Sequence, residues 1–244
     1  MRFLKRADRA KERSFLDTNE GAWIVAGRRP FAAHVVGSLV PVAFEQYARI
    51  LHPARSSLDA PVRWAAVAGW SGRTIHALAQ WDTLRRPLGE TSTGRPFNEP
   101  PDSGGLRGPE LAALCRVLAA HTTTAADCYI AVWCGYGWLD WANFASRLEL
   151  RLDQRTFVVR RGAIEMAREV GWRHPEGTFA SEPPSLIWPA DRAWFVASDV
   201  DLDSTYIGGS SVLIDAVLAN ERLESWGIGP ADPITADSDV VNGR

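Results

Sequence analysis

The stretch RLELRLDQRTFVVRRG, residues 147–162, alternates apolar and charged side chains, which restricts this part of the chain to β structure. Its first half places leucines on one face of an extended chain and charged side chains on the other, namely Leu148, Leu150 and Leu152 against Arg147, Glu149 and Arg151. Asp153 and Gln154 then form a turn. We therefore expect a hairpin that continues to Arg161.

Shorter patterns predict the remaining elements. Continuous apolar residues in CYIAVWCG (128–135) indicate a buried strand, and RAWFVASDVDLD (192–203) is a second strand. Helices are expected from Pro109, over residues 163–170, and after Ser210.

The first half of the chain is less regular. A strand over residues 33–41 is expected to run into a helix in which Phe44, Tyr47 and Leu51 are spaced i, i+3, i+7. WAAVAGW (64–70) fits a strand or a helix, and a further helix is expected to begin with Ser71 as its N-cap. These patterns predict an α+β protein with a mixed or antiparallel sheet of about five to six strands and helices packed on it.

The domain organisation follows from composition along the chain. We expect a basic N-terminal arm over residues 1–20, one α+β domain over 21–226, and an acidic, proline-containing tail over 227–244. Residues 86–110 are rich in proline and glycine, so they are either a boundary between two lobes or a lid over a site.

Charge and cysteine content limit the class of protein. The net charge of −2 gives no field that would draw the molecule onto nucleic acid or an anionic membrane. No apolar run is long enough to span a bilayer, and no hydrophobic segment follows the basic N-terminus as in a secretory signal. Cys115, Cys128 and Cys134 are odd in number and lack CxxC spacing, which favours a reducing cytoplasm.

The segment DVDLDSTYIGGS, residues 199–210, is the first candidate site. On a strand, Asp199, Asp201 and Asp203 share one face, where they form a candidate site for a divalent cation, Mg²⁺ or Ca²⁺. An EF-hand is excluded, because Ser204 stands at the glycine position and Ser210 at the glutamate position. The alternative interpretation is a solvated face where the strand ends.

The segment WCGYGWLDW, residues 133–141, is the second candidate site. Its aromatic side chains, dense after a strand, either stack on a ligand or partner or fill the core. The candidate ligand-binding residues are Trp133, Tyr136, Trp138, Trp141, Arg192 and Tyr206.

Common catalytic motifs do not occur. The chain has no Walker A sequence, and Ser71 and Ser210 lack the G-x-S-x-G spacing. Gly135 and Gly137 after a strand resemble a dinucleotide-binding turn, but Asp140 stands at the third glycine position. No two histidines have the spacing of a metal-binding pair.

Three segments carry a family resemblance: WPADRAWFVASDVDLDSTYIGGS, LVPVAFEQYARILHPA and DPITADSD. They resemble a family of uncharacterised proteins from high-GC Gram-positive bacteria, over a span from about residue 23 to the tail. The resemblance implies a single family unit and brings no activity, cofactor or catalytic residue. The order of elements is also similar to that of immunity-type α+β binding domains, which is an analogy of fold alone.

The leading hypothesis is a cytoplasmic, non-catalytic binding protein whose partner is a protein or a small ligand. The alternative is a divalent-metal-dependent hydrolase or phosphoryl-transfer enzyme. In that alternative Asp199, Asp201 and Asp203 hold the cation, and an arginine such as Arg192 stabilises developing charge.

Overall fold

The computed structural model describes residues 14–15, 20–91, 94–137, 139, 148–174 and 176–243. Most of the basic arm expected over residues 1–20 lies outside these ranges, and so do Trp138, Trp141 and Arg147. Among the helices of the described ranges, none is both long enough and apolar enough to cross a membrane.

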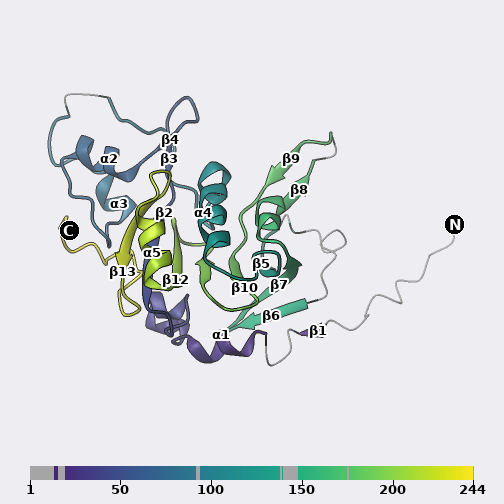
Figure 1. Ribbon diagram of the computed structural model, residues 1–244. Helices are drawn as coiled ribbons and strands as arrows, with labels where there is room; N and C mark the ends of the chain where they lie inside the picture. The colour runs from purple at the N-terminus through teal and green to yellow at the C-terminus, as the bar shows by residue number, and fades with distance from the viewer. Residues whose placement is uncertain are drawn as a thin grey trace.

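The described residues form one nine-stranded sheet in the order β1-β6-β7-β5-β10-β11-β12-β2-β13 (Figure 1). Neighbouring strands are antiparallel throughout, except that β1 runs parallel to β6. Two short hairpins, β3–β4 and β8–β9, stand apart from it. The strands are β1 (Ser14–Phe15), β2 (Gln46–Leu51), β3 (Ala54–Arg55), β4 (Pro61–Val62), β5 (Cys128–Trp133), β6 (Leu148–Leu152), β7 (Arg155–Gly162), β8 (Gly171–Arg173), β9 (Phe179–Ser181), β10 (Leu186–Pro189), β11 (Phe195–Ser198), β12 (Ser204–Gly209) and β13 (Glu224–Ile228).

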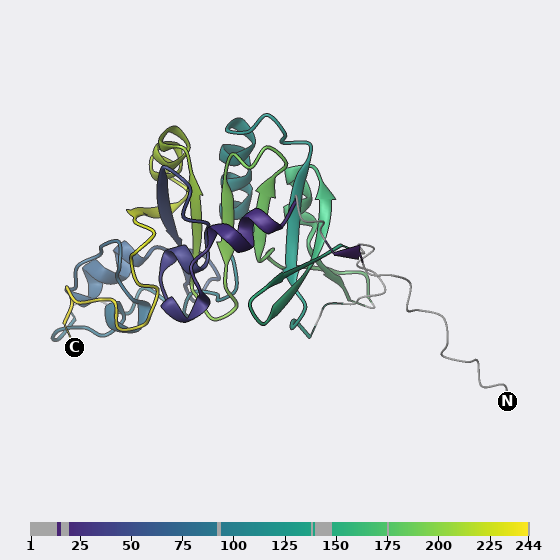
Figure 2. The ribbon, with the colours of Figure 1, turned by 90° about the horizontal axis from the view of Figure 1, so that it is seen from below.

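Both faces of the sheet are covered. The α-helices are α1 (Ala22–Gly27), α2 (Trp64–Ser71), α3 (Trp81–Leu84), α4 (Gly108–Ala120) and α5 (Ser211–Leu218), and the 3-10 helices are η1 (Phe31–Ala33), η2 (Val36–Ser38) and η3 (Ile164–Glu169). One face packs against α4, α5 and η3. The other packs against α1 and η2, with Ile234 from the tail. Figure 2 shows α1 crossing in front of the strands, away from α4 and α5.

A third apolar cluster lies beside one end of the sheet. It joins Leu51 at the end of β2 to α2 and α3, and its centre is a group of aromatic rings. Trp81 contacts Trp64 and Phe97, with ring centroids 5.5 Å and 4.8 Å apart. Phe97 belongs to the segment 86–110, so part of that segment packs on this cluster. Its expected role as a lobe boundary or a lid stays a prediction.

The expected sheet of about five to six strands is wrong, because nine strands pair in one dominant sheet and the helices are few. Part of the undercount comes from residues 44–51, expected as a helix. The spacing of Phe44, Tyr47 and Leu51 fits a helix, but residues 47–51 are all buried in strand β2. A strand buried on both faces has no clear alternation, so its period does not separate it from a helix.

The helix expected from Ser71 is also wrong. Ser71 is the last residue of α2, and Gly72 ends that helix in the left-handed conformation with a φ of 74°. STYIGG, to which the sequence assigns no element, is strand β12, and helix α5 follows it with Ser210 as the N-cap.

The elements with the clearest patterns are confirmed. The hairpin β6–β7 pairs Leu152 with Arg155 across the turn Asp153–Gln154. Helix α4 has its proline in the first turn. Ser210 caps α5, its hydroxyl oxygen accepting the Leu213 N–H at 3.3 Å.

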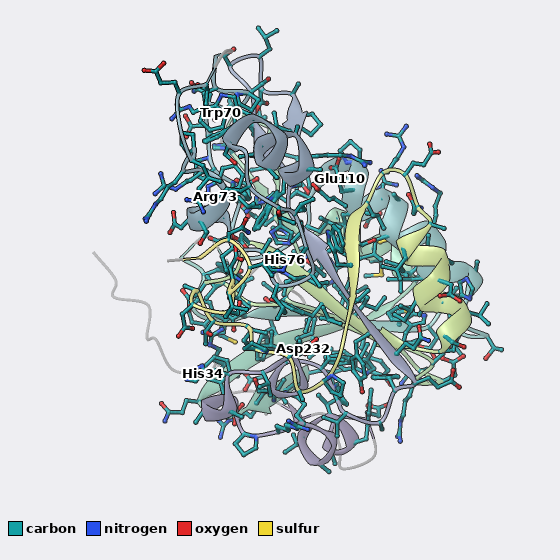
Figure 3. The ribbon with its side chains drawn as sticks, turned by 90° about the vertical axis from the view of Figure 1, so that its left-hand side faces the viewer. His34, Trp70, Arg73, His76, Glu110 and Asp232 are labelled. Atoms are coloured by element: carbon teal, nitrogen blue, oxygen red, sulfur yellow. The ribbon has the colours of Figure 1, made fainter. Side chains whose placement is uncertain are left out.

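The tail over residues 229–243 fastens two distant parts of the chain together. The backbone N–H groups of Val36 and Gly37 donate to the carbonyls of Asp232 and Pro230, each at 2.9 Å. Further along, the buried Asp239 accepts hydrogen bonds from His76 Nε2 (2.7 Å) and Gln80 N (3.2 Å). Figure 3 shows the tail on the face that carries His34, Arg73 and His76.

Beneath the segment 101–106, a buried hydrogen-bonded chain ties β2 to β12 and β11. A carbonyl only accepts, so His52 Nδ1–H donates to the Asp102 carbonyl (2.7 Å), and Nε2 accepts from the Thr205 hydroxyl (2.9 Å). Thr205 Oγ1 then accepts from the Ser198 hydroxyl at 2.7 Å. Burial is the largest influence on His52 and lowers its pKa from 6.5 to about 4.

The neutral His52 predicts a loss of stability in mild acid. The unfolded state binds a proton near pH 6.5 and the folded state only near pH 4, so the free energy of unfolding falls as the pH drops through that window. Between pH 7 and pH 4.5 we expect His52 to account for about 2–3 kcal/mol of this loss. Urea unfolding at both pH values measures it.

His52→Gln should show a smaller loss over the same interval than the wild type, because glutamine does not titrate. The exposed His34→Gln is the matched control and should keep the wild-type dependence. Equal pH dependence in His52→Gln and the wild type would refute the assignment.

Candidate functional site

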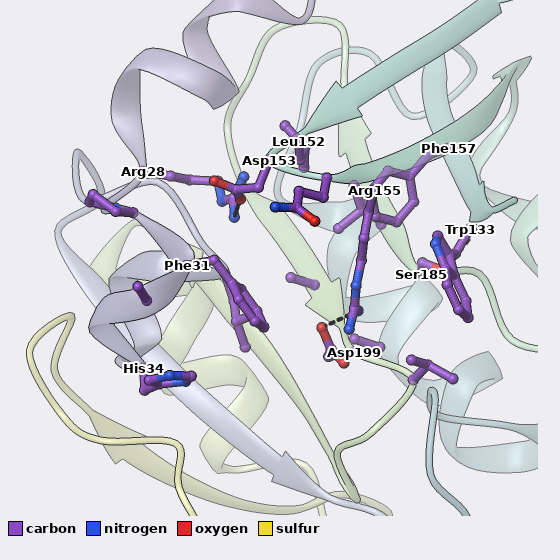
Figure 4. Close-up of a pocket in the computed structure, with 18 residues that line it drawn as sticks. Arg28, Phe31, His34, Trp133, Leu152, Asp153, Arg155, Phe157, Ser185 and Asp199 are labelled. Carbon is purple, nitrogen blue, oxygen red and sulfur yellow. Dashed lines mark hydrogen bonds and ion pairs between the residues drawn. The ribbon is translucent and has the colours of Figure 1, made fainter. Parts of the chain in front are cut away.

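A pocket of about 590 Å³ opens on the face of the sheet that α1 covers, at the end where β7 begins and β11 ends. It has three walls: the arm from Arg28 to Leu39, the β6–β7 turn, and the sheet itself (Figure 4). Its lining includes Arg28, Phe31, Trp133, Phe157, Arg155 and Asp199. A volume between about 300 and 1,000 Å³ is typical of sites for small organic ligands.

Arg155 occupies the middle of the pocket. It is the first residue of β7, and the two-residue turn before it fixes the face on which it lies. Phe157, two residues further on, shares that face. Figure 4 shows the Arg155 side chain reaching away from its strand toward Asp199, between Phe31 and Trp133.

The Arg155 guanidinium meets two carboxylates and two rings. Nη1 donates to Asp199, and Nη2 donates to Asp201 at 3.3 Å. Its central carbon lies 5.5 Å from the Phe31 ring centroid and 5.3 Å from that of Trp133. Each cation–π contact of this kind is worth about 0.5–2 kcal/mol, so the rings help hold the arginine in place.

The two carboxylates on Arg155 differ in how firmly they are held. The Asp199 side chain is 8% exposed, and its Oδ1 also accepts the backbone N–H of Asp201 at 3.1 Å. The Asp201 side chain is 79% exposed and makes the single contact with Arg155 Nη2. Asp199 is therefore a fixed part of the pocket wall, and Asp201 lies outside it in solvent.

The arm that closes the pocket is attached at both ends. Arg28 donates from Nε to the Ser38 carbonyl (2.9 Å) and from Nη2 to Asp153 Oδ2 (3.0 Å), which links the arm to the β6–β7 turn. A Cβ on Gly37 would lie 2.9 Å from the Pro230 carbonyl oxygen, so this close approach of the tail requires glycine.

The three aspartates of the expected acidic site do not form one cluster in the structure. Strand β11 ends at Ser198, and Asp199, Asp201 and Asp203 lie in the turn that leads to β12 rather than on one strand face. Asp203 pairs with the buried Arg49 at 3.6 Å, away from Arg155. No group of three or more potential metal ligands occurs among the residues that the structure describes. A divalent cation bound at these aspartates stays a prediction.

The expected aromatic site is partly in the pocket. Trp133 lines it, and Tyr136 packs edge-on against Trp133 with ring centroids 5.4 Å apart. Trp138 and Trp141 lie outside the described residues. Trp133 and Asp199, from the two separate candidate segments, are therefore brought to one cavity.

The remaining two candidates lie elsewhere. Arg192 is in the turn between β10 and β11, at the other end of these strands, with its guanidinium 5.7 Å from the Trp23 ring centroid. Tyr206 is buried on β12, and this burial raises its pKa.

Three pocket residues, Arg28, Phe31 and Arg155, were not predicted from the sequence. Arg155 does leave a signal: alternation through RTFVV places it on the face of Phe157 and Val159, a charged residue on an apolar face. Arg28 and Phe31 leave none, because their position depends on the tail that holds the arm.

Searches of protein-family models, curated proteins and solved structures find no match to this chain.

The unequal burial of the two carboxylates predicts unequal effects on stability. Asp199→Asn should lower the free energy of unfolding by about 1–3 kcal/mol, because the buried side of Arg155 loses its charged partner. Asp201→Asn should change it by less than about 0.5 kcal/mol, because an exposed ion pair contributes little. Urea unfolding of both variants at neutral pH measures the difference, and equal losses would contradict the assignment.

Proposed function

We propose that the protein binds a small organic molecule with a flat apolar body in the pocket around Arg155. The observation that carries this proposal is the combination of one cavity of ligand size with two aromatic rings that flank a single guanidinium. Pockets for small molecules combine an apolar lining with a few polar groups that fix orientation.

The lining supports each part of this description. Phe31, Trp133 and Phe157 offer ring surface, and Leu152 and Leu186 add aliphatic surface. The polar groups are concentrated around Arg155 and around Arg28 with its partner Asp153. A ligand that fills such a pocket gains from apolar burial along its body and is oriented by one polar end.

The free cysteines and the small net charge also fit the proposal. The three cysteines are free, with Cys115 and Cys128 buried, as suits a protein that works in the reducing cytoplasm. The small net charge offers no attraction to nucleic acid, which favours a small-molecule ligand over a polyanion.

Ligand-detected NMR against a library of planar aromatic fragments tests the proposal. We expect some fragments to bind the wild type. Trp133→Leu should weaken their binding about 5- to 10-fold, since an aromatic contact is worth about 1 kcal/mol or more.

Trp70→Leu is the matched control, because Trp70 packs on Phe97 in the cluster formed by α2 and α3, outside the pocket. This variant should bind the fragments as the wild type does. A library without binders, or binders equally weakened in both variants, would overturn the proposal.

A further inference from the structure

We propose that the ligand is a planar aromatic carboxylate, and that its carboxylate takes the place that Asp201 holds at Arg155 in the free protein. This inference rests on the proposed function and names the ligand class of the same pocket.

The two acidic partners of Arg155 differ in how easily a ligand could displace them. Asp199 accepts from Arg155 Nη1 and from the Asp201 backbone N–H, so each of its oxygens already accepts one hydrogen bond. Asp201 is 79% exposed and reaches Nη2 by one contact of 3.3 Å. Exposed ion pairs contribute about 0–1 kcal/mol, so Asp201 is readily displaced while Asp199 stays in place.

The charges around the pocket favour an anionic ligand over a cationic one. Arg28 and Arg155 face Asp153 and Asp199 around the pocket, so the fixed charges of these four side chains balance. A cationic ligand would approach two guanidinium groups, and the carboxylates of Asp153 and Asp199 are already paired with them. An anion that replaces Asp201 exchanges one carboxylate for another, and the charge around Arg155 is unchanged.

The shape of the guanidinium and of the rings beside it favours a flat carboxylate. A guanidinium presents parallel N–H groups that match a carboxylate, often with two hydrogen bonds. The Phe31 and Trp133 centroids lie within 5.5 Å of the guanidinium carbon, so atoms attached to a bound carboxylate lie against one or both rings. A flat ring system directly bonded to the carboxylate makes most use of this arrangement.

Calorimetric titration with three probes of one shape tests the inference: 2-naphthoate, the neutral 2-naphthamide and the cationic 2-naphthylmethylamine. We expect 2-naphthoate to bind the wild type about tenfold or more tightly than the amide, because a hydrogen bond between two charged groups is stronger than one to a neutral carbonyl. The amine should bind least.

Two variants separate the role of each side chain. Asp201→Asn should tighten the binding of 2-naphthoate about two- to fivefold and leave the binding of 2-naphthamide unchanged, because the substitution removes a competing charge at the surface. Arg155→Gln should remove the preference for the carboxylate. Thermal melting verifies that each variant is folded. If Arg155→Gln does not fold, Asp201→Asn alone is sufficient to test the displacement.

The outcomes are distinguishable. Equal binding of the acid and the amide would overturn the carboxylate inference and leave the proposed small-molecule function intact. Weaker binding of 2-naphthoate by Asp201→Asn would refute displacement of Asp201. No binding of any probe, together with a fragment library without binders, would overturn both proposals.

Discussion

Both faces of the nine-stranded sheet must be covered, because its strands carry apolar side chains on both sides. In β5, Cys128, Ile130 and Val132 face one apolar cluster, and Tyr129 and Ala131 face the other. Helices α4 and α5 cover the first face. Among the described residues, the second face is covered by the short helix α1, 3-10 turns and the tail, and the pocket lies where this thinner cover meets the ends of the strands.

Arg155 determines which ligands the pocket can bind. A hydrophobic side chain at this position would extend the apolar surface that Phe157 begins. The guanidinium instead requires partners, which it finds in Asp199, Asp201 and two aromatic rings. Arg49 shows the contrasting case. Unlike the partly exposed Arg155, Arg49 is buried, and it donates to Ser204 Oγ and to the carbonyls of Ala77 and Ala79. It therefore joins β2 to the segment before α3 and leaves no open site.

The sequence predicts the parts of this structure that depend on local patterns. The hairpin 148–162, helix α4 and helix α5 are confirmed because alternation, a proline in the first turn and a serine cap act within a few residues. Strand β2 is missed because burial on both faces removes its periodicity. The grouping of Asp199 with Trp133 and Arg155 depends on the pairing of β5, β7, β10 and β11 across long separations, which no local pattern contains.

A crystal structure of the protein with 2-naphthoate would test whether the pocket holds a flat ligand by its acidic group at Arg155. We expect carboxylate oxygens within hydrogen-bond distance of the Arg155 guanidinium and ring atoms against Phe31 or Trp133. The Asp201 side chain should be turned away while Asp199 keeps its place. A naphthoate bound elsewhere, or an Arg155 still paired with Asp201 beside an empty pocket, would contradict this mode of binding.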